Sequence, residues 1–447
     1  MSFSPTRSWF GEYLPRTGGP SPTQLAATFE KDLSEIARTR FPRAFEPMVV
    51  PLESYRELLW ATQRVLELQR RAVIQLAPDS AGRLKALKAD PADLPRLGFD
   101  EAFEVAHAID FSRADVVVAE DGPKFVEFNV GAGVGAQLEF ELERRIWRQV
   151  LQETDDPEPT ATSLYELIAG LVRRTCAELR IEPSVLLVGS LDDPAKTTRY
   201  FDTQIRLLAE FGVQARFAEL KTLLDEDGWH TDSAGRLGIV QFAEREANNC
   251  GWDMSPLVKA TQQGLIALPS QTARLVDSKK VLALLSAGLP WMSREDHEVV
   301  RRYVPWTRIV ADGRADWRGR SHQLPRLLVE QREHFVLKGA AGYSSQEVFF
   351  GLSTPSAEWE RLVNSAVESE YYVAQEVVMP VRHPIQALLD ENGNTETVMA
   401  NPRISPFCVG GVATGCSMRF NPTDQIGPVT RPYGAWPGVL LGAAQVK

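Results

Sequence analysis

Leucine and aromatic residues recur at helical spacing among charged residues from Thr23 to about Ala89. Apolar positions that repeat every three to four residues lie on one face of a helix, so the pattern predicts amphipathic helices. Three prolines between residues 42 and 51 divide the run into separate helices. We therefore expect residues 1–104 to form an N-terminal helical region.

A pattern typical of an amphipathic β-hairpin follows at residues 113–130, with the turn signal Asp121-Gly122 near its middle. Helical spacing resumes at residues 136–152 and ends in an acidic, proline-containing stretch at 153–160. This stretch marks the first expected boundary, and the hairpin and helix form a predicted unit of residues 105–155.

Strands and helices alternate between residues 160 and 270. After a helix at about 162–180, apolar runs occur at 185–189, 213–217 and 238–242, and a helical segment separates the first two. Because strands that alternate with helices pair in parallel, this part predicts a small parallel α/β unit.

The remaining residues, 271–447, combine a helix with strands. Residues 275–285 read as one helix led by an aspartate, and residues 335–350 as two strands joined by a glycine- and serine-rich loop. An apolar strand at 371–380 ends at a proline. The whole pattern predicts an α/β (α+β) protein.

Composition and charge restrict the classes of function. The chain has 447 residues, enough for roughly three domain-sized units, and its net charge is −10 from 49 Lys and Arg against 59 Asp and Glu. No basic run occurs, which argues against nucleic acid as a partner. The four cysteines show no C-x-x-C or zinc spacing, and no segment approaches the ~20 apolar residues of a membrane span. We expect a soluble, cytoplasmic protein with reduced thiols and no membrane contact.

The hairpin carries one cation and three oxygen ligands. Arg113 shares a strand face with Asp115, and Glu127 shares one with Asn129, because each pair is two residues apart. Two carboxylates and an amide oxygen are hard ligands suited to Mg²⁺. The alternative interpretation is that the two acids are solvated charges on the outer face of the hairpin.

The length of the turn decides whether these two strand faces lie on the same side of the hairpin. A two-residue loop at 121–122 would need a backbone N–H at Pro123, so we expect a three-residue loop, 121–123. That loop places Asp115 opposite Asn129 and diagonal to Glu127, with the site residues on one face.

The loop after Lys338 has the composition of a phosphate-binding flap. Gly339 and Gly342 make the backbone permissive, while Ser344 and Ser345 offer hydroxyl and N–H groups to phosphate oxygens. Lys338 would project from the strand before the loop and bridge nucleotide phosphates. The alternative is an exposed lysine at the end of an edge strand.

Two other segments suit a nucleotide. Lys279 lies near the start of an amphipathic helix, where it is either a surface charge or a second cation for phosphate. Gln375 and Glu376 lie on the apolar strand before the proline. An adenine could pair with the backbone of that strand, and Glu376 could bind a ribose or an amino group.

The R-x-D and E-x-N motifs of the hairpin, followed by these lysines, resemble the circularly permuted branch of the ATP-grasp superfamily, which includes the glutathionylspermidine synthetases. The usual order places the lysines and adenine hinge before the metal ligands, whereas here the hairpin comes first. The resemblance covers about 105–135 and 270–420. It implies an ATP-grasp-like fold that uses ATP and Mg²⁺.

The resemblance also implies roles for individual residues. Asp115, Glu127 and Asn129 would bind Mg²⁺, and Arg113 would steady the acyl phosphate and the tetrahedral intermediate. The implied ATP contacts are Lys279, Lys338, Gly339, Gly342, Ser344, Ser345, Gln375, Glu376, Val378 and Arg403. The family's flap is often richer in glycine, and no amidase domain precedes the ligase part here. The N-terminal 100 residues resemble no known segment, so the identity of the substrates does not carry over.

The glycine-rich segment 130–136 follows a strand and opens a helix, as a dinucleotide fingerprint does. Its spacing is G-x-G-x-G rather than G-x-G-x-x-G, and no second strand ending in an acid lies about 20 residues on. A Rossmann oxidoreductase is therefore disfavoured, and the glycines better suit a close approach of backbone to substrate.

No serine, cysteine or threonine lies in a nucleophile elbow, so phosphate rather than a protein nucleophile would activate the substrate. The leading hypothesis is an ATP-dependent carboxylate-amine ligase whose partners are a small carboxylate and an amine, such as an amino acid, peptide or polyamine. Such an enzyme could serve natural-product assembly. The alternatives are a small-molecule kinase and a non-catalytic nucleotide-binding protein.

Overall fold

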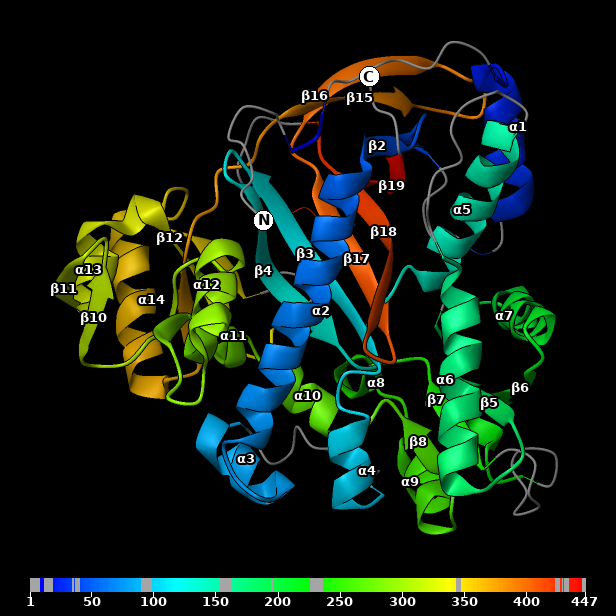
Figure 1. Cartoon of the computed structure of the whole chain (residues 1–447), viewed down its shortest axis with the longest axis horizontal. Coiled ribbons are helices and arrows are strands. Elements are labelled where there is room, and N and C mark those ends of the chain that lie inside the picture. Colours follow the sequence, from blue (N-terminus) through cyan, green and yellow to red (C-terminus); the bar gives the residue numbers. More distant parts are fainter. Residues whose placement is uncertain are drawn as a thin grey trace.

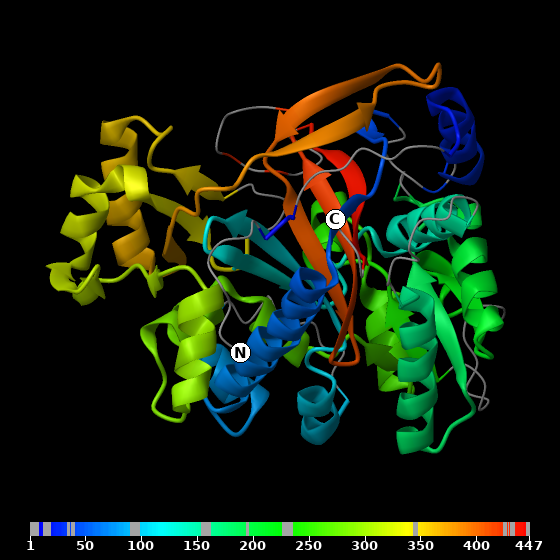
Figure 2. The same cartoon turned by 45° about the horizontal axis from the view of Figure 1, so that its top comes forward.

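The computed structural model describes residues 9–11, 19–33, 36, 41–89, 99–152, 162–193, 196–225, 236–342, 347–422, 427, 429 and 434–443. Three groups of elements lie side by side around a central sheet (Figures 1 and 2). Helices, antiparallel sheets and one parallel sheet occur together, which confirms the predicted α+β class. None of the described helices is long and apolar enough to cross a membrane.

The central sheet has six strands in the order β2-β19-β18-β17-β3-β4, and only β2 and β19 pair in parallel. Its strands are β2 (Met48–Pro51), β3 (Phe111–Ala119), β4 (Gly122–Val130), β17 (Arg403–Val409), β18 (Val412–Phe420) and β19 (Trp436–Ala443). Strands from both ends of the chain therefore meet in one sheet, and the predicted hairpin forms its β4 edge.

Helix α2 (Leu52–Ile74) lies across one face of this sheet (Figure 1). Its buried side chains share a hydrophobic cluster with Ala114, Val116 and Val118 of β3. Because side chains alternate along a strand, Arg113 and Asp115 emerge on the opposite face. The apolar face under α2 thus fixes which face of the sheet carries polar chemistry.

The predicted parallel unit is present on one side of the central sheet. Its strands, in the order β6-β5-β7-β8, all pair in parallel, and only β8 lay outside the predicted apolar runs. The elements are α6 (Leu164–Leu179), β5 (Ser184–Gly189), α7 (Thr198–Glu210), β6 (Gln214–Glu219), β7 (Leu237–Val240), α8 (Glu244–Cys250), α9 (Ser255–Gln262) and β8 (Ile266–Leu268). The acidic stretch 153–160 falls outside the described residues, and the domain boundaries stay predictions.

An antiparallel sheet of order β13-β12-β14-β9 lies on the other side. Its strands are β9 (Thr307–Ile309), β12 (Phe335–Gly339), β13 (Val348–Phe350) and β14 (Tyr372–Glu376), and α13 (Leu324–Glu330), α14 (Ser356–Ser369) and the hairpin β10 (Arg314–Trp317) and β11 (Arg320–Gln323) accompany it. Phe335 and Leu337 share a hydrophobic cluster with α13 and α14. The alternate residues, Val336 and Lys338, therefore face the pocket described below.

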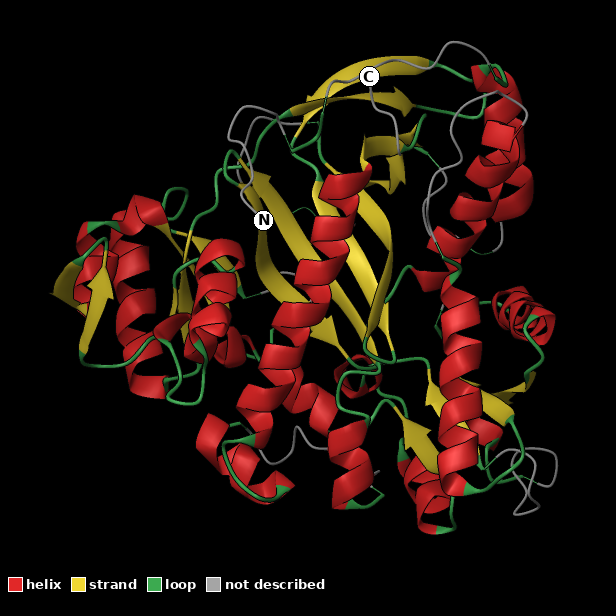
Figure 3. Ribbon diagram, in the orientation of Figure 1, coloured by secondary structure: helices red, strands yellow, loops and turns green. Residues whose placement is uncertain are grey.

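Helices α1 (Pro22–Leu33), α2 and α3 (Ser80–Leu87) match the predicted helical run, and α4 (Glu101–Ala106) follows it. Helix α1 packs on α5 (Gln137–Gln152), as Figure 3 shows in red. A further sheet joins β1 (Arg43–Ala44), β15 (His383–Leu388) and β16 (Thr395–Ala400) above the central strands. The first hundred residues thus also contribute the two short strands β1 and β2.

The single helix predicted at 275–285 is two helices, and this prediction was wrong. Asp277 ends α10 (Thr272–Asp277), Ser278 is extended with φ −60° and ψ 125°, and Lys279 begins α11 (Lys279–Ala287). Asp277 Oδ1 accepts a hydrogen bond from the backbone N–H of Val130 at 2.6 Å, so its carboxylate leads no helix. The break turns Lys279 toward the end of β4, and α12 (Arg294–Tyr303) follows.

Candidate active site

The predicted loop of the β3–β4 hairpin is wrong. The structure pairs Ala119 with Gly122, so the loop has two residues, 120 and 121. Gly122 rather than Pro123 completes the pair that closes the loop. Pro123 lies opposite Val118 on β4, which is an edge strand, where a missing N–H is tolerated.

A β-bulge then restores the convergence of the four hairpin residues. The register shifts between Asp115 and Val116, and Val126 is the extra residue on β4. Asp115 therefore lies directly opposite Glu127, and Arg113 opposite Asn129. Two carboxylates in directly opposed positions repel each other, so this arrangement requires cations nearby.

Arginines surround Asp115. Its Oδ1 accepts hydrogen bonds from Arg419 Nη2 at 2.6 Å and from Ser405 Oγ at 2.9 Å, and Arg113 Nε lies 3.8 Å away. Burial opposes the charged carboxylate, but Arg419, Arg113 and Arg403 outweigh it and hold the pKa of Asp115 well below its usual range. Asp115 is therefore a permanent anion at neutral pH.

Lys279 neutralises the second carboxylate. Its Nζ lies 2.9 Å from Glu127 Oε1 and donates to the carbonyl of Gly342 at 2.8 Å, while its backbone N–H donates to the carbonyl of Ala340 at 2.9 Å. Burial would lower the pKa of Lys279, but Glu127 and Asp277 raise it above its usual value. The same burial raises the pKa of Asp277 to about 6.

Lys338 joins the bulge to the antiparallel sheet. Its Nζ donates to the carbonyl of Val126 at 2.9 Å and to Gln375 Oε1 at 2.8 Å, and Gln375 Nε2 donates to Thr307 Oγ1 at 3.1 Å. The carbonyl of Val126 is available to Lys338 because a bulged residue is left unpaired in its ladder. The bulge that aligns Asp115 with Glu127 thus also anchors Lys338.

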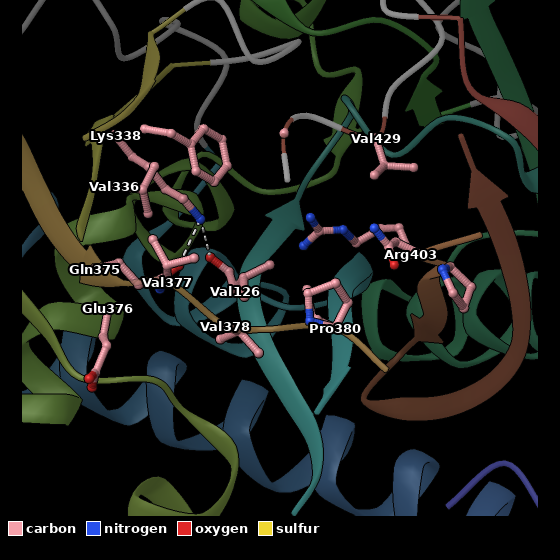
Figure 4. A pocket seen from close by; sticks show the side chains of 15 residues that line it. Val126, Val336, Lys338, Gln375, Glu376, Val377, Val378, Pro380, Arg403 and Val429 are labelled. Atoms are coloured by element: carbon pink, nitrogen blue, oxygen red, sulfur yellow. Dashed lines mark hydrogen bonds between the residues drawn. The ribbon is translucent and has the colours of Figure 1, made fainter. Parts of the chain in front are cut away.

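A pocket lies between the hairpin and the antiparallel sheet. It encloses about 560 Å³ when the part open to solvent is counted. Lys338 and Arg403 reach into it from opposite sides (Figure 4). Its lining is formed by Val117, Val126, Val336, Lys338, Phe350, Gln375, Glu376, Val377, Val378, Pro380, Asn401, Pro402, Arg403, Gly427 and Val429.

The predicted hinge residues Gln375, Glu376 and Val378 all line this pocket. The backbone N–H of Glu376 donates to the carbonyl of Trp306 at 2.8 Å. The Glu376 carboxylate points away from Lys338 in Figure 4, and Arg318 donates to it at 3.1 Å. A ribose that used Glu376 would have to compete with Arg318.

The described part of the flap requires its first glycine. A Cβ on Gly339 would lie 2.5 Å from Glu347 Oε2 and 2.9 Å from the ring of Tyr371. Gly342 presents its carbonyl to Lys279, as described above. Ser344 and Ser345 lie outside the described residues.

Arg419 and Ser405 contact Asp115, but neither was predicted. One signal in the sequence points to Arg419: it is the single charged residue among positions 404–420. A lone charge in a strand of mostly buried residues needs a partner, and this expectation leads to the site.

The side-chain oxygens of the hairpin are of a kind that suits Mg²⁺. Asp115 Oδ1 and Glu127 Oε1 are engaged, but their second oxygens accept no hydrogen bond from the described residues. Asn129 Nδ2 donates to the carbonyl of Arg113 at 3.3 Å, which leaves Oδ1 as a ligand. Within the described chain no three His, Cys, Asp or Glu side chains form a metal cluster, so a bound ion would also need the amide and phosphate or water oxygens.

No family model and no curated protein matches this chain. Its structure is similar to that of a glutathione synthetase-like effector from Globodera pallida in the apo form, with 14% identity, a TM-score of 0.58, and 94% of this chain and 95% of that chain covered. A protein from Methylobacillus flagellatus described as a γ-glutamylcysteine synthetase aligns at 11% identity over 89% of each chain, with a TM-score of 0.40. The first comparison establishes that this chain has the fold of a glutathione synthetase-like protein, while the second is too distant to support a conclusion.

Proposed function

We propose that this protein is an ATP-dependent ligase that joins a carboxylate to an amine through an acyl phosphate. The observation that carries the proposal is the convergence of five basic side chains and three carboxylates at this pocket and beside it. The basic side chains are Arg113, Lys279, Lys338, Arg403 and Arg419, and the carboxylates are Asp115, Glu127 and Asp277. Five basic side chains against three acidic ones suit anionic substrates better than neutral ones.

The fold supports the same class of reaction, because the similar structure from Globodera pallida is named as glutathione synthetase-like. In this chain the hairpin with Asp115 and Glu127 precedes Lys279 and Lys338. We propose on this order that the protein belongs to the circularly permuted branch of the ATP-grasp enzymes.

The reaction has two balanced steps. An oxygen of the substrate carboxylate attacks the γ-phosphorus of ATP, the bond from that phosphorus to the β–γ bridging oxygen breaks, and ADP leaves. The amine nitrogen then attacks the acyl carbon, the carbon–oxygen bond to phosphate breaks, and nitrogen loses a proton as the amide forms. Lys279 and Lys338 would hold the phosphates and Arg113 the acyl phosphate, so positioning and charge neutralisation supply the catalysis.

Other parts of the site would hold the remainder of the nucleotide. Gln375, Glu376 and Val378 would contact adenine and ribose, and Gly339, Gly342, Ser344 and Ser345 would cover the phosphates. Asp115, Glu127 and Asn129 would hold Mg²⁺, which neutralises phosphate charge when bound. The carboxylate and amine would be small molecules such as amino acids, peptides or polyamines.

Calorimetric titration with a non-hydrolysable ATP analogue tests the nucleotide site. We expect one analogue molecule to bind per chain with Mg²⁺ and binding to weaken strongly with EDTA, because two carboxylates face the phosphates without the ion. No binding in either condition would remove the basis of the proposal.

ADP release then separates a ligase from a kinase. A ligase needs a carboxylate and an amine together for sustained release of ADP and phosphate, whereas a kinase needs one acceptor and frees no phosphate. Binding without turnover on any acceptor would favour a non-catalytic nucleotide-binding protein.

Affinity for the analogue should fall as the pH rises from 6 to 9. Burial lowers the pKa of Lys338 to about 7, the charges of Arg403 and Lys279 lower it further, and those of Glu127 and Asp115 oppose the shift. Lys338 is therefore charged below pH 7 and loses its proton above it, and phosphates bind the charged form better. In Lys338→Arg this dependence should flatten, because arginine stays protonated; an equally steep fall in the variant would assign the dependence to another group.

A further inference from the structure

Two arginines lie directly opposite each other on neighbouring strands of the central sheet. The ladder pairs Arg403 on β17 directly with Arg419 on β18. Like charges in directly opposed positions destabilise a sheet unless an anion lies between them. Asp115 supplies one negative charge, but it contacts Arg419 at 2.6 Å and is shared with Arg113 as well.

Several hydrogen-bond donors of this pair have no acceptor among the described residues. No described residue accepts a hydrogen bond from the side chain of Arg403. Arg419 uses Nη2 alone, while its Nε is buried without a partner and the side chain is 16% exposed. A guanidinium donor that is buried without a partner is costly, which indicates that the pair is suited to receive an anion.

The position of Arg419 separates it from the nucleotide. Arg403 lines the nucleotide pocket, whereas Arg419 does not and lies one strand farther from Lys338. Ser405 Oγ accepts from Arg419 Nη2 at 3.2 Å and donates to Asp115 at 2.9 Å, which fixes the guanidinium. The guanidinium nitrogens of Arg419 that have no acceptor thus lie beyond the place where the γ-phosphate would meet Lys338 and Arg403.

We propose that Arg419, together with Arg403, binds the carboxylate of the acceptor substrate and then the acyl phosphate formed from it. This inference rests on the proposed ligase function and identifies the residue that recognises the acceptor. A planar guanidinium with free donors suits a carboxylate, which it can bind through two parallel hydrogen bonds.

The test uses inorganic phosphate as the probe anion. Its affinity is measured by calorimetry for the protein alone and for the protein saturated with Mg²⁺ and ADP. In Arg419→Gln it should fall on the order of tenfold or more, since a hydrogen bond to a charged group is lost. Arg294→Gln is the matched control, because that side chain is 92% exposed on α12 and should leave phosphate affinity unchanged.

The affinity of Arg419→Gln for nucleotides shows whether the anion that Arg419 binds belongs to the acceptor substrate or to ATP. If Arg419 binds the acceptor, Arg419→Gln should bind ADP and a non-hydrolysable ATP analogue within about threefold of the parent protein, and Arg419→Lys should lose less phosphate affinity than Arg419→Gln. A selective loss of affinity for the analogue would place Arg419 on the γ-phosphate and overturn the proposal. Wild-type protein that binds no phosphate, or Arg419→Gln that binds it normally, would also overturn it. A failure of the proposed function would give a different result: phosphate would bind in a way that depends on Arg419, but no nucleotide would bind.

Discussion

Replacing Lys338 with alanine should lower the rate of ADP release by about 10²–10³-fold, the loss typical when one preorganised donor to a developing anion is removed. The fold should remain intact. Lys338 Nζ contacts only the carbonyl of Val126 and Gln375 Oε1 among the described residues, and burial already disfavours its charge. Circular dichroism and analogue titration, run beside the rate measurement, separate lost catalysis from lost structure.

Lys280 offers a matched control for this variant. It is also a buried lysine with a lowered pKa, and its Nζ donates to the carbonyl of Leu87 at 2.8 Å, away from the pocket. Lys280→Met and Lys338→Met make the same chemical change in similar burial. We expect only the Lys338 variant to lose turnover, and near-normal turnover in it would refute the catalytic role.

The polar face of the hairpin could be predicted from the sequence because alternation along a strand is a local property. Arg113 and Asp115 share a face whatever the rest of the chain does. The loop could not be predicted in the same way, because Pro123 excluded one two-residue loop but left the alternative loop at 120–121. The bulge at Val126 is equally hidden, since no glycine or proline marks it.

The meeting of Lys279 and Lys338 depends on tertiary packing. Ser278 breaks the predicted helix so that Lys279 turns to Glu127, and Lys338 reaches the hairpin because β12 lies beside it. The sequence carries residue types for such contacts but no distances between them. Arg419 shows the same limit, because its lone charge is visible while its partner Asp115 lies 304 residues away.

Replacing Asp115 with asparagine should lower the free energy of unfolding by about 3 kcal/mol or more, the loss expected when one partner of a buried ion pair is removed. Asparagine keeps the shape of the side chain but leaves Arg419, Arg403 and Arg113 without their shared anion. Urea denaturation at pH 7 measures the change. Asp121→Asn is the control in the same hairpin: its side chain is 71% exposed and pairs with Lys124 at 2.7 Å, so its loss should be about 1 kcal/mol or less.

The effect of Asp115→Asn should also depend on pH and on anions. The folded pKa of Asp115 lies below its unfolded value of about 3.9, so its contribution is full above that value and is lost as the pH falls through the folded pKa. The stability gap between parent and variant should therefore be constant from pH 5 to 7 and narrow below about pH 4. Phosphate added at pH 7 should stabilise the variant more than the parent, because it supplies the missing negative charge to Arg403 and Arg419. Equal stability losses in Asp115→Asn and Asp121→Asn would mean that the arginines do not depend on Asp115.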